Sequence, residues 1–379
     1  MTKKFKKGSS LLLGLLLIFS VFLTSSAKAD PSCIPVFASG SSNSDRVCPS
    51  SLSQVNYVSK NLLDDLKVYP GGIPFGIKFI TDGILIIGFC DVKTDKESVN
   101  PATAAGLRIR DTIISVNGKK INDASELTKI VESSGGKPIS VEYTRDGEKK
   151  STSLTPVFSA AEGKFKTGMY VRDNGAGIGT VTFIMPDTLC FGGLGHGICD
   201  GETGGLIPIQ RGSVVNVTIN GVVKGLVGSP GEIKGYFTSG KIGSLLTNTE
   251  CGVYGAFVSL PPNANTEAVP IGKADELKEG DAFIYCTLSD NTLGKYSVRI
   301  ENIKRGETGN KCFNVKITDP ALLEKTGGIV QGMSGSPIIQ NGKLVGAVTH
   351  VLINDPTTGY GIFIENMLNA AQMPMARAS

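Results

Sequence analysis

Two segments of the 379-residue chain carry residues capable of nucleophilic chemistry. One is Gln331-Gly-Met-Ser-Gly-Ser-Pro337, in which Ser334 lies between Met333 and Gly335. The other holds His196, one of only two histidines in the chain. Serine becomes an effective nucleophile when a base removes its proton, and histidine is the usual base near neutral pH. The two segments therefore predict Ser334 as a nucleophile and His196 as its general base.

Glycines surround both residues and point to the same chemistry. In the serine segment, flexible backbone lets the N–H groups of Gly332 and Ser334 point at one spot, as an oxyanion hole requires. This arrangement resembles the nucleophile segment of chymotrypsin-like proteases, and by that pattern Ser334 rather than Ser336 is the nucleophile. The alternative is a glycine-rich hairpin with incidental serines. His196 lies in Phe191-Gly-Gly-Leu-Gly-His-Gly-Ile-Cys-Asp200, which favours a strand end facing a cleft.

A third group should orient the imidazole, and the sequence leaves two candidates open. Asp319 precedes Pro320, fifteen residues before Ser334, and Asp200 follows His196 by four. Each could instead be a turn residue, because Asp-Pro and Asp-Gly pairs commonly end strands and begin turns. The second histidine, His350, is interpreted as a structural or cleft-lining residue.

Composition excludes several other functions. Eight cysteines form no CxxC pair, and neither histidine lies at ligand spacing from them, so we expect no metal and no cofactor. A Cys33–Cys48 disulfide is open, with free thiols as the alternative. The formal charge of +4 comes from the first 29 residues, which hold five lysines and no acidic residue. The remaining 33 basic and 34 acidic residues nearly balance, so we expect no nucleic-acid partner.

The elements that must position these residues are mostly short strands. Beyond Pro156, β-like runs alternate with glycine turns for some 220 residues, a pattern typical of a sandwich or barrel. Upstream, the sequence predicts strands at Ile84–Phe89, Thr112–Val116 and Ile139–Arg145. A Pro-started helix is predicted within 100–107, and another from Asn122 or Asp123 to Val131. The pairs Asn117-Gly118 and Asp146-Gly147 predict tight hairpin turns.

This upstream region resembles a PDZ domain. Residues 100–118, reading NPATAAGLRIRDTIISVNG, match the family's motif at most positions and depart from it at Arg110, where glycine is usual. By the resemblance, Pro74, Phe75, Gly76 and Ile77 are expected to form the loop that binds a peptide carboxylate while the peptide adds as a strand. The alternatives are an ordinary strand-opening turn and a PDZ fold that serves as a regulatory clamp.

The first 29 residues predict export. A lysine-rich head, the apolar run from Leu11 to Leu23 and the small residues before Asp30 describe a secretory signal, or a retained membrane anchor. Residues 30–68 are rich in Ser, Asn and Pro, which is typical of a linker or stalk. We expect a PDZ domain at 69–157 and a peptidase domain at 158–379.

Taken together, the chain resembles the stage IV sporulation protein B peptidase family. The resemblance rests on GLGHGICD at 193–200, GAGIGTVT at 175–182 and above all 328–351, reading GIVQGMSGSPIIQNGKLVGAVTHV. It implies a mainly β chain in which a PDZ domain (α+β) precedes a chymotrypsin-like double β-barrel. It also implies Ser334 as nucleophile, His196 as base and Asp319 as the acid.

The resemblance further implies a biological role. Such a chain is an exported, self-cleaving serine endopeptidase of endospore formation, acting between forespore and mother cell. Its partners are its own stalk and a membrane-bound regulator, whose cleavage triggers intramembrane processing of a late sigma-factor precursor. Alternatives are a PDZ adaptor with an inactive protease fold, a divergent paralogue with another substrate, and a Deg/Htr-type stress protease. The last of these places its PDZ domain after the protease.

Overall fold

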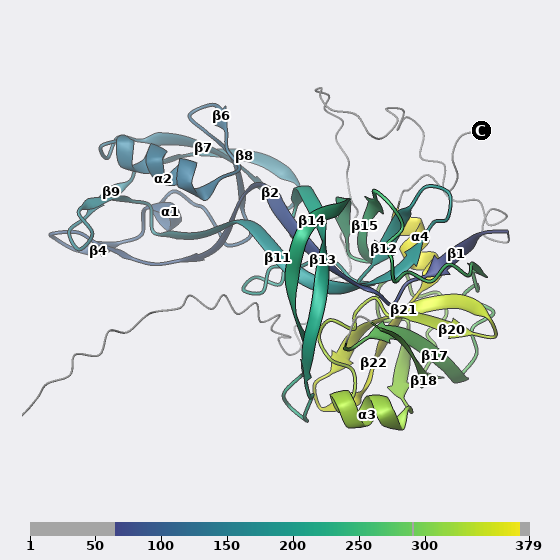
Figure 1. Ribbon diagram of the computed structural model, residues 1–379. Coiled ribbons are helices and arrows are strands. Elements are labelled where there is room, and N and C mark those ends of the chain that lie inside the picture. The colour runs from purple at the N-terminus through teal and green to yellow at the C-terminus, as the bar shows by residue number, and fades with distance from the viewer. Residues whose placement is uncertain (1–64, 290–291, 372–379) are drawn as a thin grey trace, which may run out of the picture.

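The computed structural model describes residues 65–289 and 292–371. The predicted signal or anchor at 1–29, nearly all of the predicted linker, and Cys33 and Cys48 lie outside these residues. Within the described ranges, no helix is both long and apolar enough to cross a membrane. The chain is mainly β and forms two barrels and a PDZ domain, as predicted (Figure 1).

The first barrel is closed by the long strand β2, which pairs with β11 on one side and β13 on the other. The remaining pairings run β11–β12, β12–β15, β15–β14 and β14–β13, so that six strands form a ring. Its interior is apolar, and the rings of Phe75 and Phe257 both lie against Phe191. The strands of this part are β1 (Lys67–Pro70), β2 (Pro74–Phe89), β11 (Met169–Ile184), β12 (Cys190–Gly193), β13 (Ile209–Val223), β14 (Glu232–Thr249), β15 (Gly252–Phe257) and β16 (Val269–Pro270), which pairs with β1.

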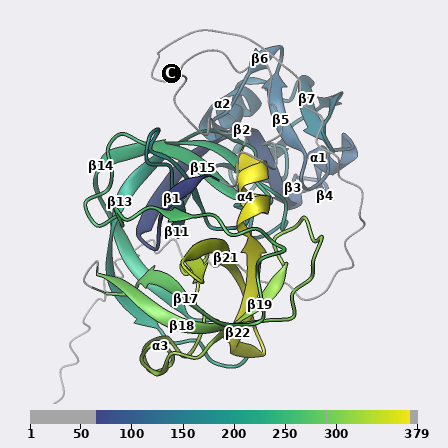
Figure 2. The same ribbon diagram turned by 90° about the vertical axis from the view of Figure 1, so that its right-hand side faces the viewer.

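The second barrel is a closed ring of six antiparallel strands in the order β17-β18-β19-β22-β21-β20. Figure 2 shows the two barrels one above the other, with the C-terminal helix α4 (Ile364–Ala371) between them. This helix packs against β12 and β15 of the first barrel and β21 and β22 of the second. The elements here are β17 (Gly280–Thr287), β18 (Leu293–Glu301), β19 (Phe313–Ile317), α3 (Pro320–Thr326), β20 (Pro337–Gln340), β21 (Lys343–Leu352) and β22 (Asp355–Phe363).

The PDZ domain is inserted between β2 and β11 and lies at the left of Figure 1. Its sheet continues directly from the barrel, because the second half of β2 pairs with β5 at Ile84↔Ile113 and the start of β11 pairs with the end of β2. Its elements are β3 (Val92–Lys93), β4 (Ser98–Val99), α1 (Pro101–Ala104), β5 (Thr112–Val116), β6 (Lys119–Lys120), α2 (Ala124–Ser133), β7 (Ile139–Arg145), β8 (Glu148–Leu154), β9 (Val157–Ser159) and β10 (Lys164–Lys166).

Local sequence signals account for the PDZ elements. Asn100 caps α1 ahead of Pro101, and Asp123 caps α2 through the N–H groups of Ser125 and Glu126. In each predicted hairpin turn, Asn117-Gly118 and Asp146-Gly147, both residues have the positive φ angles that such turns require. The predicted strands, helices and turns of this region are therefore confirmed.

The predicted carboxylate-binding loop is wrong. Pro74, Phe75, Gly76 and Ile77 lie in β2 inside the first barrel, with Phe75 fully buried and Gly76 paired with both Ile178 and Val215. A Cβ on Gly76 would lie 2.6 Å from the ring of Phe237. The Gly-Ile step resembles a PDZ loop locally, but long-range pairing with two barrel strands determines its conformation.

The expected domain boundaries shift for the same reason. Residues 74–80 of β2 belong to the first barrel, and β1 pairs with its strand β11, although both precede the PDZ domain. The peptidase fold therefore does not begin after residue 157. The hairpin formed by β9 and β10 packs instead on the PDZ helix α2, where Phe165 contacts Gly136. The PDZ domain is thus tied to the barrel by two continuous strands, which fixes its position relative to the catalytic segments.

Candidate active site

Ser334 lies in a tight turn between α3 and β20. Gly332 and Gly335 adopt φ angles of 97° and 96°, a region that favours glycine. The turn closes through a hydrogen bond from Ser336 N to Met333 O at 2.9 Å. A Cβ on Gly335 would lie 2.1 Å from the carbonyl oxygen of Thr180. The glycines predicted from the sequence are therefore required both by backbone conformation and by space.

Strand β11 of the first barrel holds this turn of the second barrel. Thr180 donates its hydroxyl to Gly332 O at 2.7 Å and its N–H to Ser334 O at 3.2 Å. Thr182 donates its hydroxyl to Gly335 O at 2.8 Å. Because the carbonyls of this turn are engaged by β11, its peptide planes are fixed from the other barrel, and the nucleophile lies at the boundary between the two.

The N–H groups of Gly332 and Ser334 have no acceptor among the residues that the structure describes. An oxyanion hole needs two such donors that do not already bind the protein. Both residues are partly exposed, so a carbonyl oxygen can approach them. The arrangement is consistent with the predicted oxyanion hole.

His196 follows β12 on the opposite side of the boundary. Leu194 and Gly195 turn the chain with φ angles of 66° and 68°, and Leu194 N donates to Thr180 O at 3.1 Å. Thr180 therefore contacts both the histidine segment and the serine turn. A Cβ on Gly335 would also lie 2.5 Å from Leu194 N, which places the two catalytic segments in direct contact.

The imidazole of His196 is oriented by its neighbour's backbone. Its Nδ1 lies 2.9 Å from the carbonyl oxygen of Gly197. A carbonyl can only accept, so Nδ1 carries the proton and Nε2 keeps a free lone pair, the form that a general base requires. Burial lowers the pKa of His196 below its usual value, while the bond to Gly197 opposes that shift. The residue is therefore an uncharged base at neutral pH.

A second histidine, His350 on β21, lies against His196. The ring centroids are 4.8 Å apart with an interplanar angle of 36°. Burial, followed by the nearby His196 and Lys311, lowers the pKa of His350 to about 3, so this ring is neutral as well. Its Nδ1 is buried without a hydrogen-bond partner among the described residues. The sequence interpretation of His350 as cleft-lining missed this contact, since nothing local indicates which residue a strand-end histidine faces.

In this structure the hydroxyl of Ser334 donates to the carbonyl oxygen of Thr349 at 2.6 Å. Thr349 directly precedes His350, so Ser334, Thr349 and the two histidines form one cluster. No hydrogen bond joins Ser334 to His196 within the described part of the chain. Catalytic hydrogen bonds are often absent without substrate, and rotation of the Ser334 side chain would be needed to make this one.

Neither candidate acid contacts His196. Asp319 is the N-cap of α3, where one carboxylate oxygen accepts from Leu322 N at 3.0 Å and the other from Ser297 N at 3.2 Å. The triad role expected for Asp319 thus has no contact supporting it. The turn interpretation, left open by the sequence, describes its geometry.

Asp200 is buried, and its contacts also stabilise local structure instead of orienting His196. One oxygen pairs with Arg172 Nε at 2.8 Å, and the other accepts from the N–H groups of Glu202 and Thr203. It organises a hairpin that leads away from His196. Of the predicted residues, the structure therefore brings together the segments of Ser334, Gly332 and His196, and it holds Asp319 and Asp200 in other interactions.

The double barrel, the PDZ insertion and the facing serine and histidine segments define a PDZ-containing serine peptidase. Residues 163–368 match the family model described as SpoIVB peptidase S55, and residues 81–155 match that of the PDZ domain. The first match covers more than half of the chain. The chain belongs to the SpoIVB peptidase family, and it is a serine peptidase of sporulation.

Solved structures similar to parts of the chain include both domain types. The PDZ domain of an SdrC-like protein from Listeria monocytogenes is 19% identical, with 24% of this chain and 87% of that chain covered and a TM-score of 0.20. The inactive form of the Rv3671c protease from M. tuberculosis is 17% identical, with 50% and 81% covered and a TM-score of 0.29.

Proposed function

We propose that the chain is an exported, self-cleaving serine endopeptidase of endospore formation. It cuts the extracytoplasmic part of a membrane-bound regulator, and this cut triggers intramembrane processing of a late sigma-factor precursor. Family membership and the lysine-headed apolar N-terminus support this role. The observation that carries it is the Ser334 turn, whose two unengaged N–H groups lie beside the segment of a neutral His196.

In the proposed reaction, the hydroxyl of Ser334 leaves Thr349 O and turns toward Nε2 of His196. The imidazole takes the proton while Oγ bonds to the scissile carbonyl carbon. The carbonyl oxygen becomes an oxyanion that accepts from the N–H groups of Gly332 and Ser334. His196 then gives its proton to the leaving amine as the peptide bond breaks. Water, activated by the same imidazole, hydrolyses the acyl-enzyme and restores Ser334.

Among the described residues, the imidazolium that forms in this cycle has the Gly197 carbonyl as its acceptor at Nδ1. A carbonyl dipole stabilises that charge less than a carboxylate does. The neutral His350 beside it adds no opposing charge, because its lowered pKa keeps it unprotonated. The same arrangement provides the correct tautomer before reaction, which is one of the contributions of a triad acid.

A matched pair of serine variants tests the proposal in the full-length chain. Ser334→Ala should abolish self-cleavage and peptide hydrolysis. Ser336→Ala should retain both, because Ser336 is fully buried and its hydroxyl has no partner among the described residues. Equal activity of wild type and Ser334→Ala would refute the catalytic assignment.

The second candidate is a PDZ adaptor with an inactive protease fold. The observation favouring it is the bond of Ser334 to Thr349 O, with no bond to His196. An adaptor would show no turnover in wild type and would leave regulator processing unchanged in Ser334→Ala. The serine pair therefore separates the two functions.

A further inference from the structure

Arg110 adopts a backbone conformation that its side chain disfavours. Its φ angle is 76°, in the left-handed region where glycine is usual and a branched or long residue is strained. This is also the position at which the chain departs from the PDZ motif by carrying arginine in place of glycine. Strain of this kind persists where the surroundings enforce it and where the side chain has a task.

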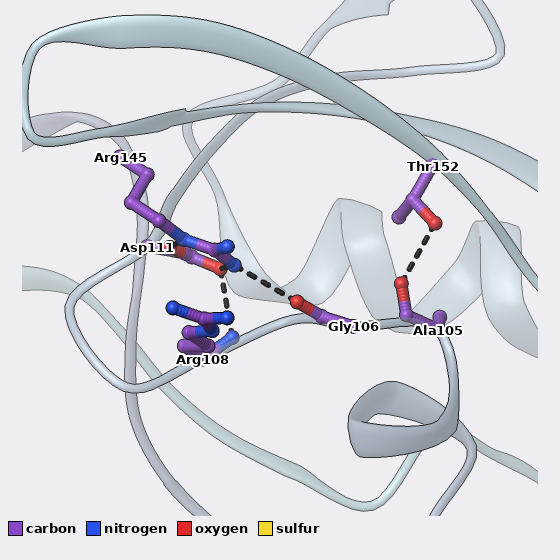
Figure 3. Close-up of polar contacts among 6 residues, drawn as sticks. All are labelled: Ala105, Gly106, Arg108, Asp111, Arg145 and Thr152. Carbon is purple, nitrogen blue, oxygen red and sulfur yellow. Dashed lines mark hydrogen bonds and ion pairs between the residues drawn. The ribbon is translucent and has the colours of Figure 1, made fainter.

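The turn that carries Arg110 is rigid. Asp111, 1% exposed, forms a paired ion contact with Arg145, whose guanidinium also donates to Gly106 O at 2.9 Å (Figure 3). The backbone N–H of Arg108 donates to Asp111 at 2.7 Å. Arg110 N itself donates to Ile86 O on β2 at 2.9 Å. The origin of the Arg110 side chain is therefore fixed relative to the strand that enters the barrel.

The guanidinium of Arg110 reaches out of the PDZ domain. Nε donates to the carbonyl oxygen of Thr203 at 3.0 Å, and Nη2 donates to the same oxygen. A cavity of about 280 Å³ lies beside this contact, lined by Arg110 and Asp146 from the PDZ domain and by Thr203 and Pro208 from the barrel. Because an open pocket rather than packed side chains lies between the two sides there, the contact is a bridge rather than part of a packed core.

Thr203 belongs to the hairpin 198–207, which begins two residues after His196. Cys199 and Leu206 form an antiparallel bridge across the hairpin, and Asp200 forms an ion pair with Arg172 of β11. At its base, Asn248 of β14 accepts from Ile198 N at 2.8 Å and donates to Ile198 O at 2.9 Å, and it also donates to Ile207 O at 3.0 Å. The hairpin is therefore a stiff element held at its base and near its tip.

The residue that joins this hairpin to His196 is Gly197, whose carbonyl orients the imidazole. Gly197 packs closely against the hairpin, because a Cβ there would lie 2.3 Å from Leu206, and against Thr249 O, which such a Cβ would approach to 2.6 Å. A shift of the hairpin would therefore act directly on Gly197 and its carbonyl. Contiguous contacts thus run from the PDZ turn through Thr203 and the hairpin to the catalytic base.

We propose that Arg110 is a positioning residue, through which the PDZ domain holds the hairpin 198–207 in the arrangement that orients His196. The inference rests on the proposed role of His196 as the general base. It makes the PDZ insertion part of the catalytic apparatus, because the Arg110 contact adds to those of Asn248 and Arg172 in holding the hairpin that adjoins the Gly197 carbonyl. The strained backbone at Arg110 is retained because a glycine there would have no side chain to reach Thr203.

Arg110→Gly in the full-length chain tests this, since glycine relieves the φ angle while removing the contact. With a fluorophosphonate probe, we expect the limiting rate of Ser334 labelling to fall about tenfold, as for loss of a charge-assisted hydrogen bond. The probe concentration for half-maximal rate should stay within about twofold. The melting temperature should be unchanged or raised. Arg110→Lys, which offers one ammonium group in place of the two guanidinium nitrogens that contact Thr203 O, should recover part of the labelling rate.

The pH dependence of the Ser334 labelling rate shows whether Arg110 positions His196 or has only a structural role. When the hairpin loosens, water reaches His196, and the acid limb of the labelling rate should move upward toward the ordinary histidine pKa of about 6.5. The titratable group facing His196 is the neutral His350, which Arg110 does not contact. Arg108→Ala, which removes the same charge from the same turn, is the matched control and should behave as wild type.

Equal labelling rates and pH profiles for Arg110→Gly and Arg108→Ala would overturn the inference. A rate loss in Arg110→Gly that merely follows a lowered melting temperature would overturn it too. Failure of the wild-type chain to label at all would instead refute the proposed function, and with it the inference that rests upon it.

Discussion

The substitution Asp319→Asn separates two accounts of the catalytic site. Asp319 caps α3 through Leu322 N and holds β18 through Ser297 N. Asparagine caps a helix about as well as aspartate, but its amide nitrogen cannot accept the hydrogen bond from Ser297 N. It also loses a favourable charge near the helix N-terminus, worth roughly 0.3–1 kcal/mol. We therefore expect kcat/KM within about threefold of wild type.

The comparison variant Asp319→Ala removes the cap altogether. It should lower the free energy of unfolding by about 1–2 kcal/mol, which corresponds to a fall of several degrees in melting temperature. Residual activity below that temperature should stay near wild type. If Asp319 were the acid that orients His196, Asp319→Asn would instead lose on the order of 10⁴-fold in kcat with its stability intact.

The assay is the initial rate of peptide hydrolysis by full-length variants, measured beside thermal unfolding of the same samples. A loss of more than about 10³-fold in Asp319→Asn without a change in melting temperature would refute the placement of Asp319 as a helix cap only.

Four further outcomes follow from the site. Asp200→Asn should lower the free energy of unfolding by about 3 kcal/mol, because it replaces the buried carboxylate that pairs with Arg172 by a neutral amide, and thermal unfolding measures this; an unchanged melting temperature would contradict the ion pair. Gly335→Ala should lose roughly 3 kcal/mol or more and all activity, since the added Cβ meets Thr180 O at the positive φ; a folded, active variant would argue against the geometry of the turn. The acid limb of kcat/KM should lie below pH 6.5, because burial lowers the pKa of His196 and keeps it neutral there; a limb above pH 6.5 would contradict this. Stability should likewise fall as pH drops below 6.5, where the unfolded chain takes up the proton that the folded chain excludes.

Much of the PDZ domain could be predicted from local sequence. The Asn-Gly and Asp-Gly pairs, the Asn100-Pro101 helix start and the alternating apolar runs each determine a short piece of backbone without reference to the rest of the chain. Local signals predicted a strand only from Ile84 to Phe89. They could not show that β2 runs unbroken from Pro74, through Gly83 with its φ angle of 98°. The barrel partners of that strand, β11 and β13, are eighty or more residues away from the residues they pair with.

The catalytic site, too, could be predicted from local sequence only in part. Glycines around Ser334 and His196 predicted that other backbone segments pass close to these residues. The structure shows this at Gly335, where a Cβ would meet Thr180 O and Leu194 N. The sequence left Asp319 open as a triad acid or a turn residue, whereas in the structure it is the N-cap of α3 and Pro320 is the first helical residue. The contact of His350 with His196 depends on how the two barrels face one another, and that of Thr349 O with Ser334 depends on how β21 lies against the serine turn within the second barrel. No local residue pattern encodes either contact.

The most direct measurement is to map the adduct of a fluorophosphonate probe on the full-length chain by peptide mass spectrometry. The catalytic assignment predicts one adduct, on Ser334 and not on Ser336, which disappears when His196 is replaced by glutamine. An adduct on Ser336, or an unmodified Ser334 in a folded wild-type chain, would contradict it.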